Sequence, residues 1–242
     1  MLDLDWPRPP GVRMAVTTRI VAGFSSPPFE HFNLGAHCGD AAEAVAANRA
    51  RLAELLGLSA APLWLRQVHG TTVLDADAPA AGEPEADAAV ARAPGRVLAI
   101  LTADCLPVAF AARDGSMVAA AHAGWRGLAA GVLEATLAAM AIDPGQVLAW
   151  LGPAIGAASY EVGAEVRDAF LVHDAAAARA FAPTRPGHWR CDLAALARRR
   201  LGAAGIACVH GGGFDTCTDP RFYSYRREPR TGRFATLIWR TR

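Results

Sequence analysis

The middle of the chain constrains the fold most, because three short apolar runs follow one another there with brief interruptions. Val97–Thr102, Pro107–Ala112 and Met117–His122 have the length and composition of buried strands. The Asp114-Gly115 pair between the second and third runs is typical of a β-hairpin. Strands joined by a hairpin are antiparallel, so the pattern argues against a strictly doubly wound parallel sheet.

Periodicity predicts helices and strands on both sides of this centre. Helices are expected at residues 40–56, with Asp40 as N-cap, and at 127–140, 162–171 and 193–201, the last capped by Asp192. Further strands are expected at residues 11–19, 63–68, 71–76, 147–151, 206–210, 221–226 and 234–239. This mixture predicts an α/β or α+β fold with mixed β-sheets covered by helices. Residues 1–242 are expected to form a single domain.

Composition and charge argue against several classes of protein. The formal net charge is only +1, so nothing in it indicates binding to nucleic acid or to an anionic membrane. No apolar run is long enough to cross a bilayer, and no charged-then-apolar leader precedes the Pro-rich start. The five cysteines are scattered without a framework spacing. We therefore expect a cytoplasmic protein with reduced thiols.

Three apolar runs end on, or are interrupted by, residues that bind metals. LWLRQVHG carries His69 at its end, TADC carries Cys105, and the run before HAGWRG ends on His122. Sites in sheet proteins form where strands end beside the start of a helix. If these strand ends meet, two imidazoles and a thiol converge.

Each of these residues also has a simpler interpretation. A histidine at a strand end is commonly a hydrogen-bonded boundary residue, and a cysteine in an apolar run is commonly a small buried hydrophobe. HAGWRG is also compatible with a tight strand-to-helix turn alone. The spacing matches no short metal motif, so the residues by themselves leave metal binding and structural roles both open.

A set of motifs in order along the chain resembles one known family. They are FNLGAHCGD at 32–40, QVHG at 67–70, ADC at 103–105, HAGWRG at 122–127, GPAIG and YEVG within 152–163, and TC, FYSYRR and TGR within 216–233. Together they resemble the laccase-domain family, whose members are also called multicopper polyphenol oxidase-like or peptidoglycan editing factor proteins. The resemblance implies a four-layered α/β/β/α fold with mixed sheets. It also implies zinc ligands at His69, Cys105 and His122.

Members of that family are described as purine nucleoside phosphorylases with adenosine deaminase activity. The resemblance therefore implies a zinc enzyme that uses phosphate to cleave adenosine or inosine to the free base and ribose 1-phosphate. Methylthioadenosine is a further substrate that the resemblance suggests. It also implies deamination of adenosine by zinc-activated water. The expected partners are a purine nucleoside and phosphate.

Two histidines and one thiolate suit two metals. With an open fourth position, zinc lowers the pKa of a bound water toward ~7. With a weak axial methionine, the same donors suit copper. A multicopper oxidase needs many further imidazoles, and the chain has only seven histidines, two of which are already used. Zinc is therefore favoured over copper.

Three arginines are candidates for binding an anionic substrate group. They are Arg126, Arg226 and Arg227. Arginine suits phosphate because its planar fork binds two oxygens at once. The helix expected from Gly127 adds free N–H groups beside His122. The simpler interpretation of these arginines is solvated surface charge.

Four other residues are candidates for the site. Asp104, next to Cys105, would orient a metal histidine or carry a proton, although strand alternation places it on the opposite face from Cys105. Tyr160 would stack on a purine or hydrogen-bond to it, or else belong to the core. The resemblance makes Asn33 and His37 substrate contacts.

Three other functions are compatible with the same residues. In the first, Cys105 is the nucleophile of a hydrolase or amidase that acts on a peptidoglycan precursor, with a histidine as its base. The second is a copper-dependent polyphenol oxidase. In the third, zinc only ties strands together, and Cys38 or His37 closes the site as a fourth ligand.

Overall fold

The three central apolar runs form strands, as the sequence predicts. The computed structural model describes residues 2, 4, 6–79 and 81–241. The runs are β4 (Val97–Thr102), β5 (Leu106–Ala112) and β6 (Val118–Ala123). β5 and β6 are antiparallel, and the hairpin between them contains Gly115 with a φ of 73°. Glycine adopts this left-handed conformation without a steric cost.

The larger sheet has six strands in the order β11-β7-β5-β6-β3-β2. Its other strands are β2 (Val73–Asp75), β3 (Ala88–Ala91), β7 (Val147–Leu151) and β11 (Cys208–Gly211). The β11–β7 and β2–β3 pairs are parallel, whereas β7–β5, β5–β6 and β6–β3 are antiparallel. The sheet is therefore mixed, as predicted.

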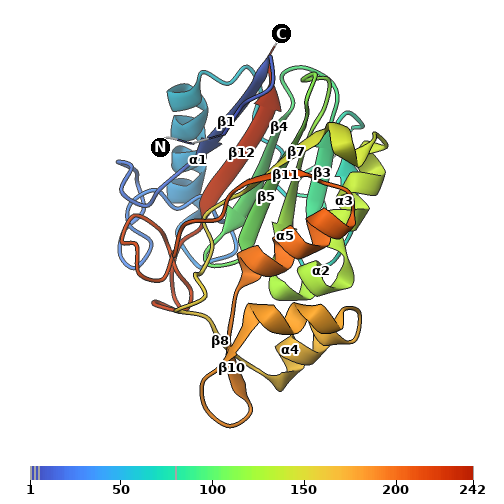
Figure 1. The fold of residues 1–242 in the computed structure, drawn as a ribbon. Coiled ribbons are helices and arrows are strands. Elements are labelled where there is room, and N and C mark those ends of the chain that lie inside the picture. The colour runs from blue at the N-terminus through green and yellow to red at the C-terminus, as the bar shows by residue number, and fades with distance from the viewer. Residues whose placement is uncertain (1, 3, 5, 80, 242) are drawn as a thin grey trace.

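Both faces of the larger sheet are covered. Val108 and Phe110 of β5 pack toward the helices, whereas the alternate residues Ala109 and Ala111 pack toward a second sheet. Because neither face meets water, β5 is apolar along its whole length. Figure 1 shows the covering helices, which are α2 (Trp125–Ala130), α3 (Val132–Met140) and α5 (Leu193–Ala203).

The second sheet has three antiparallel strands in the order β1-β12-β4. Its outer strand is β1 (Val12–Val16), and its centre is β12 (Phe234–Arg240). Ile238 of β12 faces the larger sheet, whereas Leu237 packs on the other side with Leu52 of α1 (Ala42–Leu56). The layers are therefore α1, the three-stranded sheet, the six-stranded sheet and the remaining helices (Figure 1). The four-layered α/β/β/α architecture is confirmed.

A small third sheet lies below α5 in Figure 1. Its strands are β8 (Glu161–Gly163), β9 (Phe181–Pro183) and β10 (His188–Cys191), in the order β8-β10-β9. It accompanies α4 (Ala164–Leu171) and the 3-10 helix η2 (Ala175–Ala180), while a second 3-10 helix, η1 (Pro144–Gln146), precedes β7. The helix predicted at 162–171 corresponds to α4, but its first two residues belong to β8. The three strands were not predicted, because they are too short to show a period.

Two of the predicted strands are wrong. Residues 63–68 form only isolated bridges, and the side-chain amide of Gln67 replaces a strand partner by bonding the backbone N–H and carbonyl of Leu101. Residues 221–226 form turns, and their backbone is held by side chains, for example by Asp104, which accepts the Arg226 N–H. Side-chain partners of this kind leave no signal in the local sequence.

Two further helix predictions need correction at their ends. The helix predicted at 127–140 begins at Trp125 and is broken at Gly131, whose φ of 103° is left-handed. Asp40 does not cap α1, because α1 starts at Ala42 and its N-cap is Ala41. The Asp40 carboxylate instead accepts hydrogen bonds from Ser25 and Asn33.

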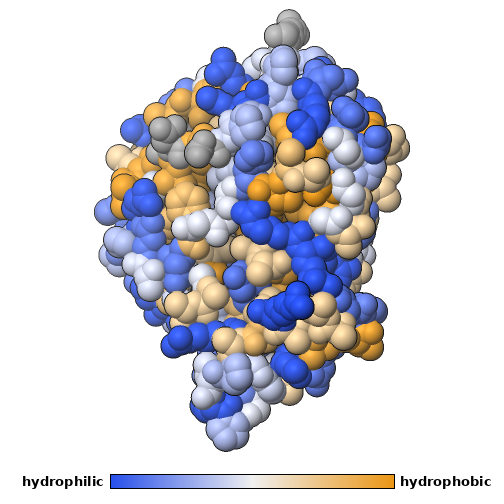
Figure 2. All heavy atoms as spheres, in the orientation of Figure 1, coloured by the Kyte–Doolittle hydropathy of each residue, from blue (hydrophilic) through white to orange (hydrophobic). Residues whose placement is uncertain are grey.

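The surface shows no continuous apolar band on the face seen in Figure 2, where hydrophilic and hydrophobic residues are interspersed. Large apolar side chains that are exposed, such as Ile20, Leu55 and Val172, lie on separate segments of the chain. Within the described part of the chain, no helix combines the length and the hydropathy needed to span a bilayer.

Candidate metal centre and cavity

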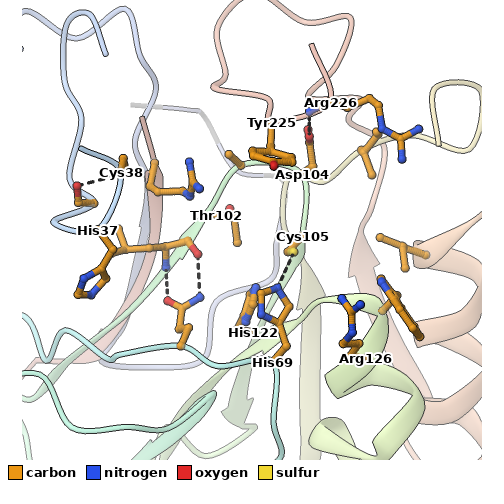
Figure 3. A pocket seen from close by; sticks show the side chains of 18 of the residues that line it. His37, Cys38, His69, Thr102, Asp104, Cys105, His122, Arg126, Tyr225 and Arg226 are labelled. Atoms are coloured by element: carbon orange, nitrogen blue, oxygen red, sulfur yellow. Dashed lines mark hydrogen bonds between the residues drawn. The ribbon is translucent and has the colours of Figure 1, made fainter. Parts of the chain in front are cut away.

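His69, Cys105 and His122 come together at one end of the six-stranded sheet. His69 lies in the loop before β2, Cys105 directly precedes β5, and His122 lies in β6. Their ligand atoms all lie within 4.8 Å of one another. The Cys105 Sγ is 3.7 Å from His69 Nε2, and the two imidazole rings meet edge to face with centroids 4.8 Å apart (Figure 3). The structure thus brings together the three residues that the sequence singled out.

Asp87 holds both histidines. It is fully buried just before β3, and its Oδ1 accepts a hydrogen bond from His122 Nδ1 at 2.8 Å. The same carboxylate accepts the backbone N–H of His69 at 2.9 Å and that of Gly70 at 2.7 Å. These bonds stabilise His69 at a φ of 62°, a left-handed conformation that is unfavourable for a residue with a Cβ. Asp87 therefore leaves His122 Nε2 available as a ligand atom.

The thiol and the buried histidine change each other's protonation in the metal-free protein. Burial raises the pKa of the Cys105 thiol, but the charge of His122 and hydrogen bonds from the two histidines outweigh it, so the pKa falls to about 6. Burial lowers the pKa of His122, but the charge of Cys105 and the bond to Asp87 outweigh it, so the pKa rises to about 9. Cys105 is thereby favoured as a thiolate, the form that binds metals.

Gly124 provides the space in which the three side chains meet. A Cβ on Gly124 would lie 2.7 Å from His69 Cδ2 and 3.1 Å from Cys105 Sγ. Its φ of −61° suits any residue, so the need for glycine here is spatial. Two imidazole nitrogens and a thiolate are donors that zinc accepts and that copper also accepts. The residues present therefore fit one such ion.

Neither His37 nor Cys38 closes this cluster. Within the described residues, the candidate metal group consists of the three side chains alone. His37 Nε2 lies 3.1 Å from Glu83 Oε2, and the Cys38 Sγ bonds the carbonyl of Gly35 at 3.3 Å. The fourth ligand suggested for a purely structural zinc site is therefore not in place.

The cluster opens into a cavity of about 500 Å³. Loops from both ends of the chain contribute to its wall, together with the start of α2. The lining residues are Gly35, His37, Cys38, Leu65, Gln67, His69, Leu101, Thr102, Ala103, Asp104, Cys105, His122, Trp125, Arg126, Ile155, Tyr160, Leu193, Tyr225, Arg226 and Arg233. Of the ten residues proposed from the sequence, eight line this cavity: His37, His69, Asp104, Cys105, His122, Arg126, Tyr160 and Arg226.

Arg126 and Arg226 lie over aromatic rings at the wall of the cavity. The Arg126 guanidinium is 4.4 Å from the Trp125 ring centroid. The Arg226 guanidinium is 5.2 Å from the Tyr160 ring centroid, and its Nη1 donates to the carbonyl of Glu161. Stacking orients the guanidinium planes without using up their donors. Burial raises the pKa of the Tyr160 hydroxyl, which therefore stays neutral.

Asp104 lines the cavity and does not hold a histidine. Its carboxylate accepts the Thr216 hydroxyl at 2.6 Å and the backbone N–H of Arg226 at 2.7 Å. The backbone at Asp104 is left-handed, with a φ of 92°, so the strand alternation assumed from the sequence does not apply there. The hydrogen bond to a candidate ligand histidine, predicted for Asp104, is made by Asp87 instead.

Asn33 and Arg227, which were predicted as substrate contacts, are not among the residues that line the cavity. Asn33 is fully buried, and its amide bonds Gly35, Asp40 and the backbone N–H of Arg233. Arg227 donates to backbone carbonyls, including those of Thr216 and Phe222. Both side chains tie loops together, because their polar groups are already bonded within the fold.

Besides Trp125, Gly35 and the aliphatic part of the lining, five residues at or behind the cavity were not predicted from the sequence. They are Gln67, Asp87, Thr102, Tyr225 and Arg233. Thr102 and Tyr225 lie beside residues that were considered, and Arg233 closes the TGR motif. Asp87 had one local signal, a carboxylate directly before the apolar run AAVA. Its role depends on contacts with residues far away in the sequence.

Comparison with known proteins extends over nearly the whole chain. The family model described as multi-copper polyphenol oxidoreductase laccase matches residues 13–241. A Xylella fastidiosa protein named purine nucleoside phosphorylase is 54% identical over 251 residues, which cover 99% of this chain and 96% of that protein. A Pseudomonas aeruginosa protein with the same activity in its name is 54% identical over 240 residues, which cover 98% of this chain and 97% of that protein.

A solved structure has the same fold. The crystal structure of a Neisseria meningitidis protein superposes with a TM-score of 0.94 and 46% sequence identity, and the match covers 98% of each chain. The structure of a Geobacillus stearothermophilus protein superposes with a TM-score of 0.86 at 30% identity, covering 98% of this chain and 94% of that one. The arrangement of layers described above is therefore shared with both proteins.

Proposed function

This chain belongs to the family described as multi-copper polyphenol oxidoreductase laccase, and on that premise we propose that it is a zinc-dependent purine nucleoside phosphorylase. The observation that carries the proposal is the group of His69, Cys105 and His122 at a cavity of about 500 Å³. That volume lies in the usual range for small-molecule sites, about 300–1,000 Å³. Relatives at 54% identity bear the name of this activity.

Zinc is the metal that we propose for the cluster. Three protein ligands with an open position are typical of catalytic zinc, whereas structural zinc usually has four. A copper oxidase with several metal ions would need further ligand clusters, and the described residues contain this one group. Bound zinc would supply Lewis-acid chemistry at its open position. Asp87 supports the site by fixing His122 from behind.

Phosphorolysis requires the rest of the cavity to hold two substrates. An oxygen of phosphate forms a bond to C1′ of the ribose, the bond from C1′ to the purine nitrogen breaks, and the electron pair leaves with the base. The net proton transfer is from phosphate to the purine. Arg126 and Arg226 bring positive charge to the wall, and the neutral Tyr160 hydroxyl is a hydrogen-bond donor and acceptor there.

Deamination of adenosine is part of the same proposal. In that reaction water replaces the amino group at C6, and inosine and ammonia are the products. It would use the same purine position beside the His69–Cys105–His122 cluster. The two reactions differ in their products, so they can be measured separately in one sample.

We also propose a cytoplasmic location. All five cysteines are free thiols. A reducing compartment preserves the Cys105 thiolate, which an oxidising one would expose to disulfide chemistry.

The test is an assay with adenosine and inorganic phosphate, combined with elemental analysis of the purified protein. Adenine with ribose 1-phosphate would report phosphorolysis, and inosine with ammonia would report deamination. We expect about one zinc per chain, because the described residues contain one three-ligand group. We expect Cys105→Ala to lose zinc and turnover together. Absence of turnover by the zinc-loaded wild type, or full turnover by Cys105→Ala, would contradict the proposal.

A second candidate function rests on the pairing of Cys105 with histidines. The Cys105 Sγ lies 3.7 Å from His69 Nε2, a geometry compatible with a thiol nucleophile and its base in a hydrolase or amidase. Such an enzyme would keep its activity in the presence of a strong chelator and lose it on alkylation. The zinc enzyme would lose activity to the chelator and regain it when zinc is added.

A further inference from the structure

We propose that Arg233 and Thr102 form the phosphate subsite of the cavity. The inference rests on the proposed phosphorolysis for its substrate, but the subsite itself rests on the contacts of these two residues. Both line the cavity, and they are close in the fold because Phe234, the residue after Arg233, pairs with Thr102 across β12 and β4.

Arg233 is held at one end of its guanidinium and not at the other. Its Nη1 donates to the carbonyls of Thr231 and Gly232, each at 2.9 Å. Within the described residues, its Nε and Nη2 have no hydrogen-bond partner, and neither atom is among the buried unpaired ones. The edge formed by Nε and Nη2 is the fork that binds two oxygens of a phosphate. Anchoring through Nη1 orients this fork before an anion arrives, which reduces the entropy lost on binding.

Thr102 provides a second observation that points to a ligand. The residue is 2% exposed, and its hydroxyl is buried without a hydrogen-bond partner among the described residues. A buried hydroxyl without a hydrogen-bond partner destabilises the folded protein, because it has lost its bonds to water. A ligand oxygen at hydrogen-bond distance would replace those bonds. Figure 3 shows Thr102 between the side of the cavity that carries Cys38 and the side that carries Cys105.

The surroundings of Arg233 are compatible with an anion. A Cβ on Gly35 would lie 2.7 Å from both Arg233 Cγ and Cys38 Sγ, so the glycine allows these two side chains to pack together. Burial raises the pKa of the Cys38 thiol, which is therefore neutral and does not repel phosphate. The nearby Asp40 carboxylate is turned to other partners, since it accepts bonds from Ser25 and Asn33.

Arg233 also differs from the other two arginines of the cavity. Arg126 and Arg226 are exposed, whereas Arg233 is half-buried. An ion pair is screened less where water is partly excluded, so a half-buried fork binds phosphate more strongly. Arg126 and Arg226 lie instead over Trp125 and Tyr160, on a wall better suited to the purine.

This assignment places the two substrates on opposite walls. Figure 3 shows Cys38 and Arg126 on opposite sides of the cluster, and Arg233 packs with Cys38. In-line displacement at C1′ needs the attacking phosphate oxygen and the departing purine nitrogen on opposite sides of the carbon. Phosphate at Arg233 and Thr102, with the purine toward Arg126 and Tyr160, meets that requirement.

The experiment measures binding of inorganic phosphate to the zinc-loaded protein by titration calorimetry, and the KM for phosphate in the adenosine assay. We expect Arg233→Gln to weaken phosphate binding about 10- to 100-fold, the range for hydrogen bonds to a charged group. Arg233→Lys keeps the positive charge but lacks the guanidinium fork. Its phosphate affinity should therefore lie between those of the wild type and Arg233→Gln. Thr102→Val should weaken phosphate binding about 3- to 10-fold. The KM for adenosine should stay within about twofold in all three, since no nucleoside contact is removed.

Two matched controls separate ligand binding from structure. Thr236→Val removes another buried hydroxyl without a partner, on β12 and outside the cavity lining, and should not change phosphate binding. Arg230→Gln removes an exposed arginine from the same loop as Arg233 and should also leave it unchanged. Because the Thr102 hydroxyl has no hydrogen-bond partner in the described part of the chain, Thr102→Val should not lower the thermal stability.

The outcomes decide between the alternatives. Wild-type phosphate affinity in folded, zinc-loaded Arg233→Gln, or a loss that follows Arg226→Gln alone, would overturn the subsite. Failure of the wild type to bind phosphate would do the same. If Arg233→Gln does not fold, Arg233→Lys and Thr102→Val give the answer. Phosphate binding that depends on Arg233 without any nucleoside cleavage would leave the subsite standing and refute the proposed function.

Discussion

Asp87 and His122 are joined by a 2.8 Å hydrogen bond from His122 Nδ1 to a carboxylate that is itself fully buried. The same carboxylate accepts the backbone N–H groups of Val68, His69 and Gly70. One side chain therefore sets the ring orientation of one candidate ligand and the backbone conformation of another. It does so from a position that is not itself in the metal group.

The first prediction concerns this positioning residue. Asp87→Asn should lower zinc affinity about 10- to 100-fold, because an amide cannot accept all of these bonds and no longer favours the His122 tautomer with Nε2 available. Competition with a chromogenic chelator measures the affinity. Asp114→Asn is the control, since the Asp114 carboxylate accepts the Ser116 N–H within its own hairpin, away from the cluster. Equal zinc affinity in Asp87→Asn and wild type would refute the role.

The second prediction concerns the space at Gly124. Gly124→Ala should fold but bind zinc weakly, because the added methyl group would lie 2.7 Å from His69 Cδ2 and displace a ligand. Zinc content after dialysis, together with thermal unfolding, tests this. Gly202→Ala in α5 is the matched control, since nothing lies within 4 Å of its Cβ position. That variant should retain zinc and gain about 0.5–1 kcal/mol of stability from helix propensity. Full zinc occupancy in Gly124→Ala would show that the cluster does not need this space.

The third prediction is a pH dependence in the metal-free protein. The pKa of the Cys105 thiol is lowered from 9.0 to about 6, so alkylation by iodoacetamide should accelerate as the pH passes through about 6. His122→Asn removes the main stabilising charge and should move the midpoint back toward the ordinary value. Mass spectrometry of the modified peptides follows the rate, with Cys38 as an internal control whose pKa is raised by burial. A midpoint near 9 for Cys105 would contradict the proposed thiolate.

The fourth prediction concerns stability below neutral pH. The Asp215 carboxylate accepts the Ser159 hydroxyl at 2.6 Å and the N–H groups of Gly156 and Cys217 at 3.0 Å. Burial raises its pKa, but these bonds outweigh burial and hold the pKa below 3.8. The carboxylate therefore stabilises the fold above the unfolded pKa, and this contribution is lost as the pH falls through the folded value.

Asp215→Asn should accordingly lower the free energy of unfolding by about 1–2 kcal/mol at neutral pH. The difference from wild type should shrink as the pH falls below about 4. Urea unfolding at several pH values measures this, and a difference that does not depend on pH would contradict it. Asp143→Asn is the control, because it changes a carboxylate at the exposed turn before β7 and not a partly buried one. The free energy of unfolding of this variant is measured at the same pH values.

The parts of the fold that could be predicted are those whose burial is uniform. β4, β7 and β12 lie close to their predicted positions because strands covered on both faces appear as continuous apolar runs. Asp192 caps α5 as predicted, accepting the Ala195 N–H at 2.8 Å, because this interaction spans only three residues. Uniform burial and short-range capping can both be recognised from a few neighbouring residues in the sequence.

The remaining features depend on contacts between distant residues. Residues 63–68 have the sequence pattern of a strand. In the fold, however, the side-chain amide of Gln67, not a backbone partner strand, bonds the N–H and carbonyl of Leu101. Asn33 and Arg227 were predicted to bind substrate. Their side chains form hydrogen bonds with the backbone of Arg233 and of Thr216, which come close only in the folded chain. Asp87 and Arg233 gain their roles from neighbours brought close by sheet pairing. For the metal cluster, the motifs in their order supplied information that spacing alone did not.

The position of β12 has a consequence for synthesis of the chain. β1 and β4 are not neighbours in their sheet, because β12 lies between them. During translation both strands emerge long before β12, and until it emerges each lacks its hydrogen-bonded neighbour in that sheet. The nascent chain therefore carries two apolar strands with open edges, and it is most exposed to wrong pairing during this interval.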